Sequence, residues 1–214
     1  MKFSSLMVEA PTEAYGGAAQ IGFEEFLDGR ANFADVLDIV MEGLDEAIYK
    51  EIEKSLKAAV TNLQAANKKT ETSFVEKSMD DLLSVADSYG RSAIYCTFEF
   101  AATMKPDKEW ASDAHKNQMW ANGYITDYKG HNVIVLPQSY EDETNSKKVI
   151  DPSHCYIIPT GADKPVKIAI EGQTAVREVE NEDWSREVQV YKKLGVGAVI
   201  TNNICVYINS SLQQ

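Results

Sequence analysis

The chain has 214 residues, a formal net charge of −12, and the apolar and charged content of an ordinary folded protein. This length suits one large domain or two small ones. No apolar run approaches the ~20 residues that span a bilayer, and residues 1–9 lack the apolar core of a secretory signal, so we expect no membrane partner.

The negative charge argues against a broad nucleic-acid-binding surface, because phosphate groups repel an acidic protein unless its basic residues cluster. The clusters here are pairs, Lys68-Lys69, Lys147-Lys148 and Lys192-Lys193. We interpret each as a solvated surface. An acidic wall could still enclose DNA without binding it specifically.

The first predicted elements are an extended segment and a long helix. Residues 3–31 contain glycines and a few apolar anchors, which favours extended chain with loops. Asn32 is a predicted helix N-cap, followed by Asp35 in the first turn. Apolar residues then recur at three- and four-residue steps from Phe33 to Leu63, which predicts a helix roughly 45 Å long. The alternative is a coiled-coil or bundle helix, but the apolar stripe keeps no strict heptad.

The remaining elements are shorter. Residues 64–77 are polar and predict a linker, and residues 139–151 predict an exposed loop. Helices are predicted from Ser78 to Ser88, with Ser78 as cap, and from about Lys108 to Asn122, with Gly123 as C-terminal cap. Strands are predicted for seven β-type runs: Ala93–Phe100, Tyr124–Thr126, Val133–Leu136, Cys155–Ile158, Val166–Ile170, Ala198–Ile200 and Val206–Ile208.

The best candidate for covalent chemistry is the run Asp151, Ser153, His154 and Cys155. A Cys–His nucleophile pair is one reading of it. Adjacent residues of an extended segment point to opposite faces, so His154 is badly placed to take the Cys155 proton. A turn before a strand explains the same residues. We therefore predict no catalytic residue.

No metal or cofactor site is predicted either. The three cysteines, Cys96, Cys155 and Cys205, are too far apart for a zinc motif or a disulfide framework, and they favour a reducing compartment. His115 and His131 lack a partner at metal-ligand spacing. The glycines at 16, 17, 195 and 197 form no phosphate loop, and the paired acids Glu24-Glu25, Asp80-Asp81 and Glu182-Asp183 are interpreted as solvated faces or caps.

Three tryptophans, Trp110, Trp120 and Trp184, are candidates for core anchors or interface residues. Trp110 and Trp120 lie ten positions apart on one predicted helix. The sequence leaves open which of the three is buried and which makes contacts with a partner.

The order of these segments resembles the major capsid proteins of tailed bacteriophages, whose fold is shared with encapsulin compartments and the floor of herpesvirus shells. The resemblance covers roughly residues 10–208. Its residues are the long helix, the run Arg91–Tyr95, the C-terminal strands from Gly123 onward, and the run Asp183–Glu187 before Gly195-Val196-Gly197. Each motif is weak alone, and their order carries the likeness.

The resemblance implies an α+β fold with a long spine helix, a peripheral domain and an axial domain. It assigns residues 1–31 to a residual extended-loop or N-terminal segment. Residues 32–66 and 151–195 would form the peripheral domain, and residues 67–150 and 196–214 the axial domain. Members usually carry an N-terminal arm and a β-hairpin loop before the spine helix. The thirty residues here suffice for the returning strand alone, which fits a fragment, a processed product or a short variant.

The expected function is a structural subunit of an icosahedral phage head, assembling into pentamers and hexamers around double-stranded DNA in the cytoplasm of the bacterial host. The resemblance also implies a scaffold, a maturation protease and a portal as partners. Two alternatives remain. One is an encapsulin-like compartment shell. The other is a monomeric α+β enzyme or ligand-binding protein with a convergent site around Asp151, His154 and Glu187.

Overall fold

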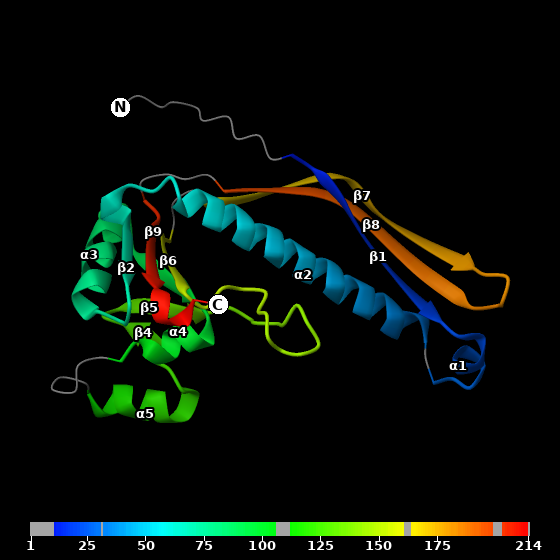
Figure 1. Cartoon of the computed structure of the whole chain (residues 1–214), viewed down its shortest axis with the longest axis horizontal. Coiled ribbons are helices and arrows are strands. Elements are labelled where there is room, and N and C mark those ends of the chain that lie inside the picture. Colours follow the sequence, from blue (N-terminus) through cyan, green and yellow to red (C-terminus); the bar gives the residue numbers. More distant parts are fainter. Residues whose placement is uncertain (1–10, 31, 106–111, 161–163, 199–202, 214) are drawn as a thin grey trace. The chain divides into compact units, whose positions relative to one another are not determined.

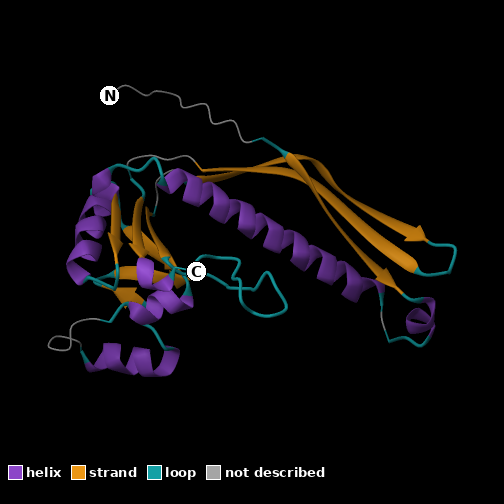
Figure 2. Ribbon diagram, viewed as in Figure 1, coloured by secondary structure: helices purple, strands orange, loops and turns teal. Residues whose placement is uncertain are grey.

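A computed structural model describes residues 11–30, 32–105, 112–160, 164–198 and 203–213. The chain divides into two compact units. Unit 1 comprises Met1–Leu56 and Val166–Val199, and unit 2 comprises Lys57–Pro165 and Ile200–Gln214. Helices and strands are mixed in the fold (Figure 2), so the predicted α+β class is confirmed. Among the described residues, no helix is long and apolar enough to cross a membrane.

Unit 1 is a helix packed on a three-stranded antiparallel sheet (Figure 1). The strand order is β1-β8-β7, so β1 and β7 are the two edges. The sheet contains β1 (Glu13–Ile21), β7 (Val166–Glu180) and β8 (Arg186–Ala198), and the short helix α1 spans Phe23–Leu27. The sequence predicted only the first third of β7, because its later residues are mostly polar and alternate weakly.

The long helix α2 spans Phe33–Val60, three residues shorter than predicted at its C-terminal end. Its predicted cap is confirmed, since the backbone N–H of Asp35 donates to the Asn32 side-chain oxygen at 2.9 Å. One face of the helix packs on the sheet. This core contains Ile21, Val36, Val40, Leu44, Val188 and Val190.

Two adjacent glycines of β1 allow a close approach on both faces of the strand. A Cβ atom on Gly17 would lie 2.9 Å from Val40 Cγ1 of α2. A Cβ atom on Gly16 would lie 2.8 Å from the ring of Tyr191 on the neighbouring strand. The pair therefore serves packing within unit 1.

Unit 2 contains a six-stranded mixed sheet in the order β2-β9-β6-β3-β5-β4. Its strands are β2 (Lys68–Glu71), β3 (Ser92–Cys96), β4 (Asp127–Tyr128), β5 (His131–Val135), β6 (His154–Pro159) and β9 (Cys205–Asn209). Three helices accompany them, α3 (Glu76–Asp87), α4 (Phe98–Thr103) and α5 (Asp113–Asn122). Two short 3-10 turns lie at Ala65–Asn67 and Ser210–Leu212.

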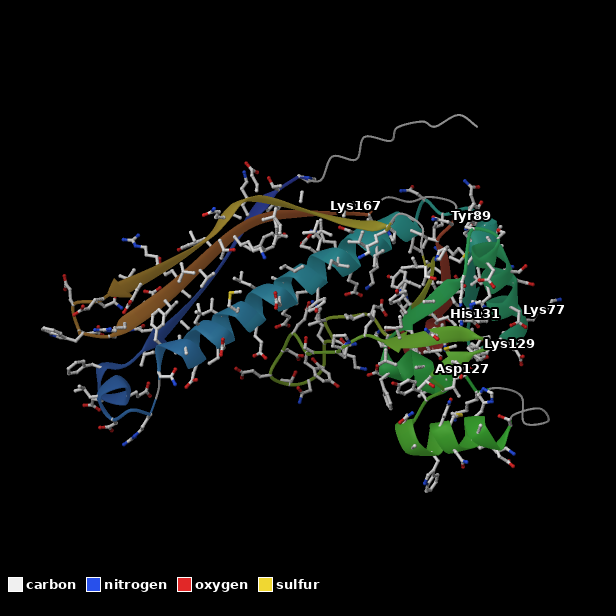
Figure 3. The ribbon with its side chains drawn as sticks, turned by 180° about the vertical axis from the view of Figure 1, so that it is seen from behind. Lys77, Tyr89, Asp127, Lys129, His131 and Lys167 are labelled. Carbon is white, nitrogen blue, oxygen red and sulfur yellow. The ribbon has the colours of Figure 1, made fainter. Side chains whose placement is uncertain are left out.

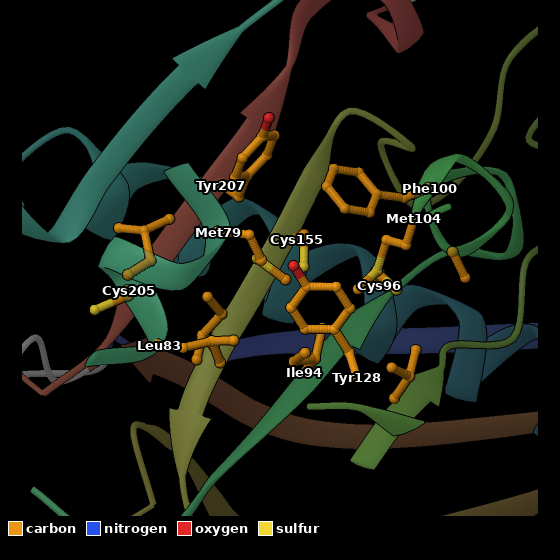
Figure 4. Close-up of a cluster of buried hydrophobic side chains, with 14 of the residues drawn as sticks. Met79, Leu83, Ile94, Cys96, Phe100, Met104, Tyr128, Cys155, Cys205 and Tyr207 are labelled. Carbon is orange, nitrogen blue, oxygen red and sulfur yellow. The ribbon is translucent and has the colours of Figure 1, made fainter. Parts of the chain in front are cut away.

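The core of unit 2 is one cluster of buried side chains (Figure 4). It collects α3, α4 and the central strands around aromatic and sulfur-containing side chains. Phe100 and Tyr207 meet edge to face with ring centroids 5.7 Å apart. Every residue of β9 is buried. The side chains that fill this core all come from unit 2 itself.

Three sequence predictions in unit 2 were wrong. The polar stretch 64–77 contains β2, which pairs in parallel with β9. The strand predicted for Ala93–Phe100 stops at Cys96, because Thr97 begins α4: its hydroxyl accepts from the N–H of Phe100 at 3.4 Å. Helix α3 begins two residues before Ser78, whose hydroxyl instead donates to Glu71 at 2.7 Å.

Other predictions hold in part. Gly123 ends α5 in the left-handed conformation with φ 79°, as predicted. The helix begins after the Ser112 cap, and residues 106–111 lie outside the described residues. No strand forms at Tyr124–Thr126. Ala198 ends β8, and residues 199–200 are not described.

Residues 57–66 and 151–165 belong to unit 2, and residues 196–198 belong to unit 1. The reason for placing residues 151–165 in unit 2 is that β6 pairs with both β3 and β9 in the six-stranded sheet.

Candidate assembly surfaces

The residues first considered for chemistry form a turn at the start of β6. The Asp151 carboxylate accepts from the backbone N–H and the hydroxyl of Ser153, at 2.9 and 2.7 Å, and from Lys57 Nζ at 2.9 Å. His154 Nδ1 lies 3.5 Å from the same carboxylate. Burial opposes ionisation of Asp151, but the bonds from His154, Ser153 and Lys57 outweigh it and hold its pKa well below the usual range.

Cys155 does not complete a nucleophile pair. Its side chain is buried in the core of unit 2, whereas the His154 ring interacts with Asp151 and stacks on Tyr156. Burial, followed by a hydrogen bond with Cys96, raises the pKa of the Cys155 thiol. A nucleophile needs the opposite shift. Glu187, the third residue of the alternative site, lies on β8 of unit 1.

The other histidines hold structural contacts. His131 Nε2 lies 3.3 Å from Asp87 and its Nδ1 lies 3.1 Å from the Ser92 hydroxyl, which itself donates to Asp87. These contacts join the end of α3, β3 and the β4–β5 hairpin, where Figure 3 labels His131 beside Lys129. His115 Nδ1 lies 2.7 Å from the hydroxyl of Ser112, the residue that caps α5.

Charged residues near this hairpin are also paired. Lys129 contacts Glu76 at 2.7 Å and reaches Asp80, whose neighbour Asp81 lies on the same helix. Across the described ranges, no group of three or more histidine, cysteine or acidic side chains could hold a metal ion. The exposed features of unit 1 therefore have the stronger claim to function.

The first feature is the edge strand β7, which is exposed along nearly its whole length. Ile168, Ile170 and Val176 are 46, 59 and 52 % exposed. Their register partners Val196, Leu194 and Val190 place them on the helix-facing side of the sheet. We call Ile168, Ile170 and Val176 the β7 stripe. An exposed edge strand that carries apolar side chains is a template for pairing with another chain.

The second feature is a groove between β1 and α2, with a cavity volume of about 330 Å³. Small residues line it, including Gly16, Gly17, Gly43 and Ala47. Ile39 of α2 also lines the groove and is 63 % exposed. Because β1 pairs only with β8, the groove lies at the other edge strand of the same sheet.

The third feature is an exposed aromatic pair at the turn between β7 and β8. Trp184 is 64 % exposed, and its ring centroid lies 6.2 Å from that of Phe23 in α1. Trp184 has φ 63°, a left-handed conformation that is unusual for a bulky residue. Asp183 fixes the turn by accepting from the N–H and hydroxyl of Ser185 at 3.1 and 2.6 Å.

Of the other two tryptophans, Trp120 lies in the described part of the chain. Trp120 on α5 is 94 % exposed, and no residue of that helix is buried. Trp110 lies outside the described residues. The sequence identified Trp184 and Trp120 as candidates but missed the β7 stripe and the groove. The β-branched run Val166–Ile170 predicted a strand, but its composition could not reveal that this strand is an edge.

The chain matches one family model over residues 6–208, described as SPbeta prophage-derived putative capsid protein YonB. No curated protein matches it. Similar solved structures include the head of Helicobacter pylori bacteriophage KHP40, with TM-score 0.64 and 14 % identity over 95 % of this chain and 76 % of that one. The holo-SrpI encapsulin complex from Synechococcus elongatus PCC 7942 has TM-score 0.60 and 13 % identity over 95 and 75 %.

A phage-related protein from Bordetella bronchiseptica RB50 is also similar, with TM-score 0.63 and 10 % identity, covering 94 % of this chain and 76 % of that one. At identities of 10–14 %, these solved structures show the fold alone. The family match covers nearly the whole chain. The expected phage capsid fold is thus confirmed, and the structural role it implies is that of a shell subunit. The chain belongs to the family of SPbeta prophage-derived capsid proteins represented by YonB.

Proposed function

We propose that the protein assembles into pentamers and hexamers that close as an icosahedral head around double-stranded DNA. The observation that supports this most directly is the pair of unequal free edges in unit 1. The β7 stripe lies on one edge strand, and the groove lies along the other, β1. A contact between two different surfaces repeats head to tail, and it closes into a ring where the rotation between neighbours closes.

We propose further that unit 1 corresponds to the peripheral domain, with α2 as its spine helix, and unit 2 to the axial domain. Assembly would take place in the host cytoplasm. The acidic charge suits a wall that encloses DNA without specific contacts. A scaffold, a maturation protease and a portal would be further partners, as in the phages that the chain resembles.

The test is particle formation by the full chain, measured by negative-stain electron microscopy together with size-exclusion chromatography and light scattering. We expect shells, or rings of five or six subunits. A double variant, Ile168→Lys with Ile170→Lys, should remain folded but assemble poorly. The matched control is Gln173→Lys with Thr174→Lys, which adds the same two positive charges at exposed positions of the same strand without removing a large apolar side chain.

A folded monomer at assembly concentrations would contradict the proposal. Particles of normal size and yield from the stripe variant would show that β7 is not a contact edge. The nucleic-acid content of particles purified from infected or induced cells separates a genome-bearing head from a compartment shell. Particles that carry protein cargo and no DNA would favour the encapsulin-like alternative.

A further inference from the structure

Two of the three buried thiols in unit 2 lie on neighbouring strands at the same level of the sheet. The pairing of β3 with β6 runs from Ser92 opposite Pro159 to Tyr95 opposite Tyr156. One further step along this register places Cys96 opposite Cys155. All three cysteines are free.

Cys96 and Cys155 also point to the same side of the sheet. Directly opposed residues of an antiparallel pair share a face. Both side chains are fully buried in one core cluster, together with Ile94 and Ile157 two positions away (Figure 4). Burial, followed by an interaction with Cys96, raises the pKa of Cys155, which agrees with this placement of the two thiols.

We propose that Cys96 and Cys155 are a site of reversible oxidation, at which a cross-strand disulfide forms within one subunit. Opposed residues in an antiparallel pair have Cα atoms about 4.5–5.5 Å apart, and disulfides span Cα separations of about 4.4–6.8 Å. The backbone geometry of the strand pair therefore suits the bond. Burial of both thiols and the raised pKa of Cys155 slow this oxidation, so the oxidant must be small and in excess; hydrogen peroxide meets this requirement.

The reaction balances with hydrogen peroxide as the oxidant. One thiol loses two electrons to the peroxide, giving a sulfenic acid and one water molecule. The second sulfur then attacks the sulfenic sulfur, forms the S–S bond and displaces a second water molecule. Two electrons leave the thiol pair, the peroxide is reduced to water, and the protein loses two hydrogen atoms. The bond is broken again by a dithiol reductant.

The third cysteine provides a control within the same unit. Cys205 is buried on β9, where its register partner is Ile157 and its sulfur receives a contact from Asn67 at 3.5 Å. Burial raises its pKa to about 11. Cys205 therefore shares the burial of the pair without a thiol directly opposite it. If Cys96 and Cys155 become cross-linked and Cys205 does not, burial alone cannot explain the difference.

The experiment treats the folded full chain with hydrogen peroxide, quenches it, and unfolds it in the presence of an alkylating reagent. Intact mass then counts the blocked thiols, and peptide mapping identifies any cross-link. We expect loss of two free thiols per chain, a peptide joining Cys96 to Cys155, alkylation at Cys205, and full reversal by dithiothreitol.

Three variants sharpen the test. Cys205→Ala should form the bond as the wild type does, whereas Cys96→Ala and Cys155→Ala should each abolish it and leave the remaining thiol free. Alanine suits the buried positions because it adds no polar group, and circular dichroism checks that each variant is folded. A cross-link that includes Cys205, a bond between subunits, or irreversible oxidation without a cross-link would overturn the proposal.

Discussion

The two sheets of the molecule differ in how much of their apolar surface their own unit covers. The six-stranded sheet of unit 2 contains a strand, β9, in which every residue is buried, and its core is closed by α3 and α4. The three-stranded sheet of unit 1 has one helix on one face, and its edge strand β7 keeps three large apolar side chains about half exposed. Unit 2 therefore buries a large core within its own chain, whereas the sheet of unit 1 leaves these apolar side chains available to neighbours.

The largest effect on stability is expected in the core of unit 2. Replacing Phe100 by alanine removes a fully buried ring that packs on Tyr207. We expect the free energy of unfolding to fall by about 3–5 kcal/mol. Phe98 of the same helix is the control, because it is 48 % exposed and its loss should cost far less. Hydrogen exchange of the β3 and β6 amides measures both; equal losses would contradict a self-sufficient core.

A smaller effect is expected at the helix-sheet contact of unit 1. Gly17→Ala places a Cβ atom 2.9 Å from Val40 Cγ1 and should destabilise unit 1 by about 1–3 kcal/mol. The control is Gly43→Ala in α2, where the new Cβ meets nothing within 4 Å. This second change should stabilise the helix by about 0.5–1 kcal/mol. Hydrogen exchange of the α2 amides measures both, and the same sign for the two variants would refute the packing argument.

Features of the fold that depend on local sequence could be predicted, and those that depend on long-range pairing could not. The long helix, its Asn32 cap and the Gly123 cap could be predicted, because they depend on local periodicity and local hydrogen bonds. The strand β2 could not be predicted. Its four residues, Lys68–Glu71, are polar, and their place is set by pairing with β9 at the far end of the chain.

A strand-to-helix junction shows the same limit of prediction from composition. Thr97 ends a strand and starts a helix, which a reading by β-type composition alone could not separate. Strand alternation predicted that the His154 and Cys155 side chains point to opposite faces, and the structure places them in different surroundings. The assembly surfaces were beyond reach, because whether a strand is an edge depends on which strands pair with it.

The next prediction concerns the pH dependence of unit 2. The pKa of Asp151 is lowered in the folded state, so its contacts stabilise the fold above its ordinary pKa of about 3.9 and are lost as the pH falls toward the folded value. Asp151→Asn should cost about 1–3 kcal/mol near neutral pH. The difference from wild type should shrink below about pH 4. Urea denaturation near neutral pH and below about pH 4 measures the free energy of unfolding of both proteins. A difference that stays the same at the two pH values would contradict the role assigned to Asp151.

The smallest effect on stability, and a large one on assembly, is expected at the turn between β7 and β8. Glu182 and Glu187 flank the turn, and Asp183 fixes it by accepting from Ser185. Reversing the charge at Glu182 and Glu187 while keeping Asp183 should change the free energy of unfolding by less than about 0.5 kcal/mol. It should nevertheless reduce particle yield, because a mismatched charge at this turn would be repeated at every equivalent contact of the shell.

Asp183→Lys is the informative counterpart of the Glu182→Lys, Glu187→Lys double variant. It also reverses one charge, but it removes the two bonds that Asp183 accepts from Ser185, next to the left-handed backbone of Trp184. It should therefore lower stability as well as yield. Thermal denaturation and particle counts by electron microscopy separate the two effects. Normal particles from the double variant would place the contact elsewhere on unit 1, with the β7 stripe and the groove as the remaining surfaces, because neither depends on the charge of this turn.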